Sequence, residues 1–314
     1  MINKIRNTFS NGIKSVGLPI LALCWVSFFW GTTWIASKEG VRYMPGIQMA
    51  AIRQFIAGIL YISFFILIKA PWPKGKQWKT IIILAILNFS LSNGLSTAGV
   101  KYISSGLGAI IAAIFPIWVV IISFFRGEKI AKLAVAGLII SFGGICIIFY
   151  KHLADFVLPD FRLGIVLSVL ATITWAFGTL HTKKKAESFN PYFSLGLQMF
   201  FSSLLLLSYT EVSGIWTDLS EIPLNSWYAI AYLVVVGSLI TFSIFVYSLQ
   251  KLRPEVSSIY AYINPIVAIL LGSAIFGEQL SPSITLGVIV TIFGLFMVNR
   301  SMRQSRKDTR ILIK

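Results

Sequence analysis

The chain has 314 residues, of which 56% are hydrophobic and only 12% are charged, and its mean hydropathy is +0.81. A soluble domain typically has about 25% charged residues, so the composition excludes an ordinary soluble protein and favours a membrane protein. The formal net charge of +16 would suggest nucleic acid in a soluble chain. Here an excess of basic residues on the cytoplasmic side of a membrane explains it, and no nucleic-acid partner is expected.

The first apolar run follows a basic segment, residues 1–17, which contains Lys4, Arg6 and Lys14. This arrangement resembles a signal peptide, but the run from Leu18 to Ser37 is longer than the apolar part of one. No small-residue cleavage site follows it. We therefore expect a retained first transmembrane helix and a cytoplasmic N-terminus.

Nine further apolar runs follow, each long enough to cross a ~30 Å hydrocarbon core as a helix. They span 47–68, 80–99, 104–125, 133–150, 163–181, 192–212, 226–249, 256–276 and 283–299. Alternating strand patterns are absent, and the short connections leave no room for a separate soluble domain. The sequence predicts an all-α polytopic membrane protein with ten transmembrane helices in the lipid bilayer.

The distribution of basic residues predicts the topology. With a cytoplasmic N-terminus, the segments 1–17, 69–79, 126–132, 182–191, 250–255 and 300–314 are cytoplasmic, and they hold 21 of the 27 Lys and Arg residues. The outside segments hold five, and Arg53 lies within the second run. This bias predicts that both termini are cytoplasmic and that 300–314 is a basic cytoplasmic tail. We expect the protein to be a multi-pass protein of the plasma (inner) membrane.

The chain also contains a long-period repeat. A proline, an apolar run and Gly-Glu occur once at Pro116 and Glu128 and again at Pro265 and Glu278, 149 and 150 positions apart. A period of this length indicates two copies of one unit, 18–150 and 163–299. Five helices is an odd number, so the second copy is expected to be inverted in the membrane, as in many secondary transporters.

Other residues share the period. Trp30 matches Trp175, Lys38 matches Lys183, and Arg53 matches Gln198, each at a spacing of 145. The small residues Gly137, Ser141 and Gly144 match Gly287, Thr291 and Gly294 at 150. Small residues three and four apart let two membrane helices approach closely, so this set is expected to pack the fifth helix and the tenth.

Several short motifs resemble a known family. They are Trp30-Gly31-Thr32-Thr33-Trp34 followed by Lys38, Arg53-Gln54-Phe55, Lys101-Tyr102 and the two proline…Gly-Glu runs. Their order and duplication over residues 18–300 resemble the EamA-type ten-helix transporters of the drug/metabolite transporter superfamily. The resemblance implies two inverted five-helix repeats and a central cavity lined mainly by helices 1, 3, 4, 6, 8 and 9. It also implies export or exchange of amino acids, metabolites or toxic compounds.

Polar and aromatic side chains inside apolar runs are the candidates for binding a substrate, because each is costly in lipid unless it pairs or meets water. The substrate-binding candidates are Trp30, Thr33, Asn88, Asn93, Trp118, Trp175, Tyr247, Tyr260 and Asn264. Trp34, Ser90, Ser96 and Ser243 are further candidates. For each of them, packing against a neighbouring helix or an interfacial position is the alternative interpretation.

A second group is expected to act in gating or structure: Arg53, Pro116, Glu128, Pro265 and Glu278. The two prolines free the carbonyl groups of Ala112 and Ala261 and are expected to kink their helices beside the cavity. Arg53 is costly at membrane depth, with a snorkelling side chain as one interpretation and a functional one as the other. The two glutamates are expected to pair with basic side chains at helix ends, or to form a gate.

The interpretation is a transporter that exports or exchanges small metabolites, amino acids in particular, by alternating access. The alternatives are a proton-coupled drug/metabolite antiporter, a gated channel and an intramembrane enzyme. An enzyme is disfavoured because no nucleophile with a base is evident at depth. Cys24 and Cys146 lie in apolar runs and only two histidines, His152 and His181, are present, so neither a metal site nor a cofactor is expected. The oligomeric state is open.

Overall fold

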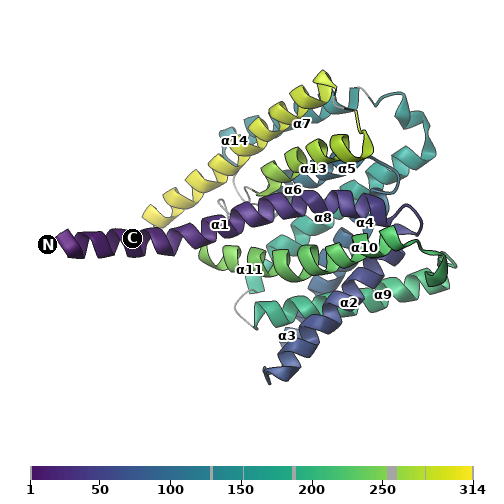
Figure 1. The fold of residues 1–314 in the computed structure, drawn as a ribbon. Helices are drawn as coiled ribbons and strands as arrows, with labels where there is room; N and C mark the ends of the chain where they lie inside the picture. The colour runs from purple at the N-terminus through teal and green to yellow at the C-terminus, as the bar shows by residue number, and fades with distance from the viewer. Residues whose placement is uncertain are drawn as a thin grey trace.

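The computed structural model describes residues 2–127, 130–150, 152–185, 189–252, 260–279 and 281–312, and within these ranges the side chains from 17 to 182 and from 189 to 301. The described residues form helices joined by short loops, without any strand (Figure 1). The helices are α1 (Ile2–Gly40), α2 (Gly46–Leu67), α3 (Lys76–Leu84), α4 (Gly94–Gly99), α5 (Ser105–Ala113), α6 (Phe115–Phe125), α7 (Lys132–Tyr150), α8 (Pro159–Lys185), α9 (Pro191–Val212), α10 (Leu224–Tyr232), α11 (Phe242–Lys251), α13 (Tyr260–Phe276) and α14 (Pro282–Leu312).

Four further segments have a different helical pitch. Two are short 3-10 turns in loops, η2 (Asp155–Val157) and η3 (Leu219–Glu221), and two are π-helical segments, η1 (Ala85–Asn93) and η4 (Leu233–Thr241). Each π segment joins two α-helices into one long rod. Ala85 and Leu233 are 148 positions apart, close to the period of the sequence repeat. π-Helical turns occur frequently at functional sites, so both segments are candidates for the functional region of the bundle.

The prediction of an all-α polytopic membrane protein is confirmed. Within the described residues, nine helical rods are long and apolar enough to cross a bilayer, and the shorter apolar helix α13 is a further one. Each agrees with a predicted run to within a few residues; residues 256–259 of the ninth run lie outside the described part. Large apolar side chains such as Phe64, Phe142 and Phe293 are exposed on the outer surface, as a lipid-facing surface requires.

The two expected proline kinks differ. Pro116 stands at the start of α6, and the fourth rod is interrupted at Ile114, between α5 and α6. Pro265 instead lies inside α13, which continues through it as one helix. At Pro116 the helix is therefore broken, which is a stronger effect than the expected kink. At Pro265 the helix continues without a break.

The helices of the two halves intermix. Helix α1 packs on α13 and on the rod of α10, η4 and α11, while α8, the corresponding helix of the second half, packs on α5, α6, η1 and α4. The most extensive contacts are α7 with α14 and α2 with α9. In Figure 1 the start of α1 and the end of α14 project from the same side of the bundle. An even number of membrane crossings would produce this placement; the inverted repeat itself stays a prediction.

The contact of α7 with α14 depends on glycine. A Cβ atom at Gly137 would lie 2.6 Å from the carbonyl oxygen of Gly294, and one at Gly144 would lie 2.7 Å from that of Gly287. Between these pairs, the Ser141 hydroxyl donates to the Thr291 carbonyl oxygen at 3.3 Å. The helices are antiparallel here, since Gly137 meets Gly294 and Gly144 meets Gly287. The small residues predicted to pack the fifth helix and the tenth therefore do so.

Candidate functional site

A cavity of about 160 Å³ lies among the spanning helices, and both halves of the chain contribute to its wall. Its lining residues come from α1, η1, α4, α5, α6, α8, α11 and α13, which are parts of helices 1, 3, 4, 6, 8 and 9 as the family resemblance implied. One residue of α2, Arg53, is an addition to that set. The cavity is the candidate binding site.

Most of the predicted binding residues are brought together here. Those in the cavity wall are Trp30, Thr33, Asn88, Asn93, Trp175, Tyr260 and Asn264. Trp118 and Tyr247 are not among the residues of the wall. Trp118 is on α6, one turn beyond Phe115, which forms the wall where the fourth rod is broken. Tyr247 is five residues after the wall residue Phe242, so its side chain is rotated by about 140° around α11.

Aromatic rings form one part of the wall. The ring of Trp30 lies 4.9 Å from that of Phe242 and 5.1 Å from that of Tyr260, both in edge-on geometry. Tyr260 stacks against Phe115 at 6.2 Å, and its hydroxyl interacts with the indole of Trp175. The two tryptophans matched by the repeat therefore contact the same tyrosine. Such rings offer an apolar surface with polar edges to a solute.

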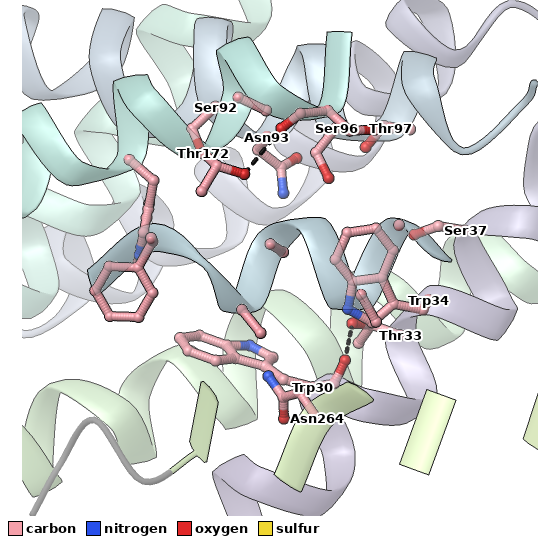
Figure 2. Close-up of a pocket in the computed structure, with 18 of the residues that line it drawn as sticks. Trp30, Thr33, Trp34, Ser37, Ser92, Asn93, Ser96, Thr97, Thr172 and Asn264 are labelled. Carbon is pink, nitrogen blue, oxygen red and sulfur yellow. Dashed lines mark hydrogen bonds between the residues drawn. The ribbon is translucent and has the colours of Figure 1, made fainter. Parts of the chain in front are cut away.

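Hydroxyl and amide groups form the facing part. Figure 2 shows the side chains of Ser92, Asn93, Ser96, Thr97 and Thr172 opposite those of Trp30 and Asn264. The side-chain oxygen of Asn93 accepts a hydrogen bond from the Gln54 amide at 3.1 Å, so the amide nitrogen of Asn93 is not used in this bond. Thr172 donates to the carbonyl oxygens of Ser168 and Ile111, at 2.8 and 3.2 Å.

Asn264 joins the cavity to the helix packing. Oriented so that its amide nitrogen meets acceptors, it donates to the Ser27 carbonyl oxygen of α1 at 2.6 Å and to the Tyr260 carbonyl oxygen at 3.3 Å. This residue precedes Pro265. The structure thus supports both interpretations of Asn264, because one side chain lines the cavity and also bonds a neighbouring helix.

Several wall residues were not selected from the sequence. Ser37, Ser92, Thr97, Ser168 and Thr172 are small hydroxyl residues, which occur commonly in membrane helices because they can bond their own backbone. A signal was nevertheless available on α1. Trp30, Thr33, Trp34 and Ser37 have the spacing of one helical face, which is the face that lines the cavity.

Arg53 is buried in the cavity wall, with only 5% of its surface exposed. Its Nε donates to the Ser238 hydroxyl of η4 at 2.9 Å. A Cβ atom at Gly237 would lie 3.1 Å from Nη2, so the absence of a side chain there leaves room for the guanidinium. The side chain therefore points into the helix bundle instead of snorkelling along its surface.

Next to the wall residue Ser37, Lys38 begins a group of polar contacts that also includes Glu278, and we call this group the clamp. Lys38 Nζ donates to the carbonyl oxygens of Val100, Lys101 and Ile103, at 2.9, 3.2 and 2.7 Å. One oxygen of Glu278 accepts from the backbone and hydroxyl of Ser105, at 2.7 and 2.8 Å, and the other accepts from the Gly106 backbone at 3.2 Å.

The clamp satisfies both ends of the connection between α4 and α5. Lys38 supplies donors to carbonyl groups of the loop that follows α4. Glu278 supplies acceptors to the first N–H groups of α5, where a negative charge is favourable. Glu278 also attracts Lys38 electrostatically. Glu278 therefore caps a helix of the other half in addition to facing a basic side chain. Its counterpart Glu128 lies outside the described residues.

A polytopic helical membrane protein whose spanning helices enclose a cavity lined by hydroxyl, amide and indole groups has the architecture of a membrane transporter. In the described part of the chain, no group of three or more His, Cys, Asp or Glu residues could hold a metal ion.

The profile of the EamA-like transporter family matches residues 17–150 and 162–300, and the chain belongs to this family. The chain is 28% identical over 284 residues to the uncharacterized inner membrane transporter YedA of Escherichia coli K12, with 90% of each chain covered. It is 27% identical to the uncharacterized transporter YvbV of Bacillus subtilis, over 91% of this chain and 93% of that one. It is also 27% identical to the WAT1-related protein At3g02690, chloroplastic, of Arabidopsis thaliana, over 92% of this chain and 72% of that one. A crystal structure of another protein, 15% identical, covers 92% of this chain with a TM-score of 0.63 and has the same fold.

Proposed function

We propose that this protein exports or exchanges small metabolites, with amino acids as the substrate class, across the inner (plasma) membrane. The cavity carries the proposal. Its aromatic rings suit the apolar part of a solute, and its hydroxyl and amide groups suit the polar part. The similarity to YedA, which is named as an inner membrane transporter, supports a location in the inner membrane. The excess of basic residues in alternate loops supports cytoplasmic termini.

Alternating access between two inverted halves, 18–150 and 163–299, is the proposed mechanism. Three features support it. Helix α1 packs on helices of the second half and α8 packs on helices of the first half. The glycine contact of α7 with α14 is antiparallel, and each half contains one π segment at a matching position. In such a mechanism the halves move around a site between them. The wall has no Asp, Glu or His among its described residues, which favours movement down the substrate gradient over proton coupling.

The test is counter-transport in liposomes containing the purified protein and loaded with a panel of amino acids and other metabolites. A carrier accelerates uptake of a labelled solute when the same solute is present inside, whereas a channel does not. Exchange of an amino acid is the expected result. If nucleotide sugars or polyamines are exchanged and amino acids are not, the substrate class is wrong; if uptake occurs without stimulation, the carrier mechanism is wrong.

Replacement of cavity residues tests the site. Trp30→Ala and Asn93→Ala are each expected to lower the rate of exchange by more than about 10-fold, because each removes a surface that orients the solute. Trp25→Ala and Asn225→Ala serve as controls, since Trp25 is on the same helix but outside the cavity wall and Asn225 is exposed on α10. Yield and melting temperature would show that the variants fold. Wild-type exchange in the two cavity variants would contradict the site.

A further inference from the structure

Among the residues that the structure describes, one cation, Arg53, lies in the cavity wall, and most of its hydrogen-bond donors have no partner in that part of the chain. A guanidinium has five N–H donors and no acceptor. At Arg53, only Nε has a hydrogen-bond partner among the described residues, the Ser238 hydroxyl. The ion pairs among the residues that the structure describes are Arg42 with Glu39 and His152 with Asp155, so no described carboxylate pairs with Arg53. A buried charge of this kind is costly unless something pairs with it.

The half-buried cation of the clamp shows the contrast. Lys38 has three carbonyl acceptors and an attracting glutamate, which together satisfy its ammonium group. Arg53 has one neutral acceptor. A cation kept only for helix packing would be expected to have the environment of Lys38. Arg53 is instead directed to a cavity, with space provided by Gly237.

We infer that Arg53 binds the carboxylate of the transported solute. This rests on the proposed function and narrows it to solutes that carry a carboxylate. The planar guanidinium forms paired hydrogen bonds with a carboxylate, and the negative charge would compensate the buried positive one. With one described cation in the wall, a singly charged carboxylate is matched better than a phosphate dianion.

The rest of the solute is expected to be apolar or aromatic. Thr33, which lies close to Gly237 beside Arg53, is one turn of α1 from Trp30. A carboxylate at Arg53 therefore places the adjoining part of the molecule toward the ring cluster of Trp30, Phe242 and Tyr260. An aromatic amino acid, or the acid that lacks its amino group, has this arrangement of a carboxylate next to an apolar group.

The test uses three probes that differ only in their charged groups: phenylalanine, 3-phenylpropanoate and phenylalaninamide. Their binding to the purified protein is measured by the rise in melting temperature with probe concentration. The two carboxylates are expected to stabilise the wild type and the amide is not. Arg53→Gln is expected to weaken binding of the carboxylates by about 10- to 100-fold, as for the loss of a charge-assisted pair. Arg53→Lys, which keeps the charge and loses the fork, is expected to lie between the two.

A structural role for Arg53 predicts a different result. If its main task is to hold α2 to η4, Arg53→Gln should lower the melting temperature without ligand. If Arg53 is kept for the solute, removing an uncompensated buried charge should leave this temperature unchanged or raise it by a few degrees. Arg42→Gln is the matched control, because it removes the same charge at an exposed position paired with Glu39. It is expected to bind all probes like the wild type.

Two outcomes would overturn the inference: stabilisation of the wild type by the amide as much as by the acids, or unchanged carboxylate binding in Arg53→Gln. Failure of this inference is distinguishable from failure of the proposed function. If liposomes exchange cationic or uncharged metabolites and no carboxylate, the transporter stands and the assignment of Arg53 falls. If they exchange no solute of the panel, the proposed function falls.

Discussion

Replacing Gly144 with leucine is expected to prevent α7 and α14 from packing, and to abolish recovery of folded, monodisperse protein. A Cβ atom at this position would lie 2.5 Å from the Thr291 backbone nitrogen and 2.7 Å from the Gly287 carbonyl oxygen. These are backbone atoms of a helix, so they cannot rotate away as a flexible side chain could. Overpacking a core typically costs 1–3 kcal/mol, and separating a whole helix pair should exceed the upper part of that range.

The neighbouring glycine supplies the control for this variant. Around Gly143, one position away on the same helix, an added Cβ would meet no atom within 4 Å. Gly143→Leu makes the same change in hydrophobicity and helix propensity and should fold like the wild type. Gly287→Leu, at the position on α14 that faces Gly144, should behave like Gly144→Leu because its Cβ would lie 2.7 Å from the Gly144 carbonyl oxygen. Size-exclusion profiles and melting temperatures of the three variants measure this. Equal behaviour of Gly143→Leu and Gly144→Leu would contradict the role of the contact.

The positions of the spanning helices could be predicted from the sequence because lipid imposes one rule on every segment. Each must be apolar, long enough and helical, and these requirements are visible in composition and length. The glycine contact of α7 with α14 was predictable for a related reason, since the repeat duplicates the small residues on both helices. Features that the bilayer or the repeat requires can be recognised from short segments of the sequence.

The site was predictable only in part. Trp30, Trp175 and Asn264 stood out because large polar or aromatic groups are unusual in their surroundings. The π segments η1 and η4 were not foreseen, because the extra residue in each turn arises from packing and not from a sequence motif. They change the angular positions of the residues around them, so a helical wheel with the usual pitch would misplace those near Asn88 and Gly237. For Arg53 the sequence was compatible with a side chain that snorkels to the interface or with a functional one. The hydrogen bond to Ser238, 185 residues away, shows that the side chain points into the bundle.

Replacing Glu278 with alanine is expected to open the clamp and to slow exchange by about 10-fold or more. The carboxylate accepts three hydrogen bonds at the start of α5, two from backbone groups and one from the Ser105 hydroxyl, and it attracts Lys38. Hydrogen bonds to charged groups contribute about 1.5–3 kcal/mol each. Alternating access requires each side to close in turn, so destabilising the closed state by even one such amount changes its population about 10-fold or more.

Accessibility of the cavity measures the opening directly. A cysteine at Ser96, a cavity residue on α4, would be labelled by a membrane-impermeant maleimide added from outside, in a background where Cys24 and Cys146 are replaced by alanine. Glu278→Ala is expected to raise the labelling rate, since the predicted topology places the clamp on that face. Glu39→Gln is the control, because Glu39 pairs at the surface with Arg42 and takes no part in the clamp. Unchanged labelling in Glu278→Ala, with exchange still lost, would mean that Glu278 stabilises α5 without gating, and that closure of this side depends on other contacts.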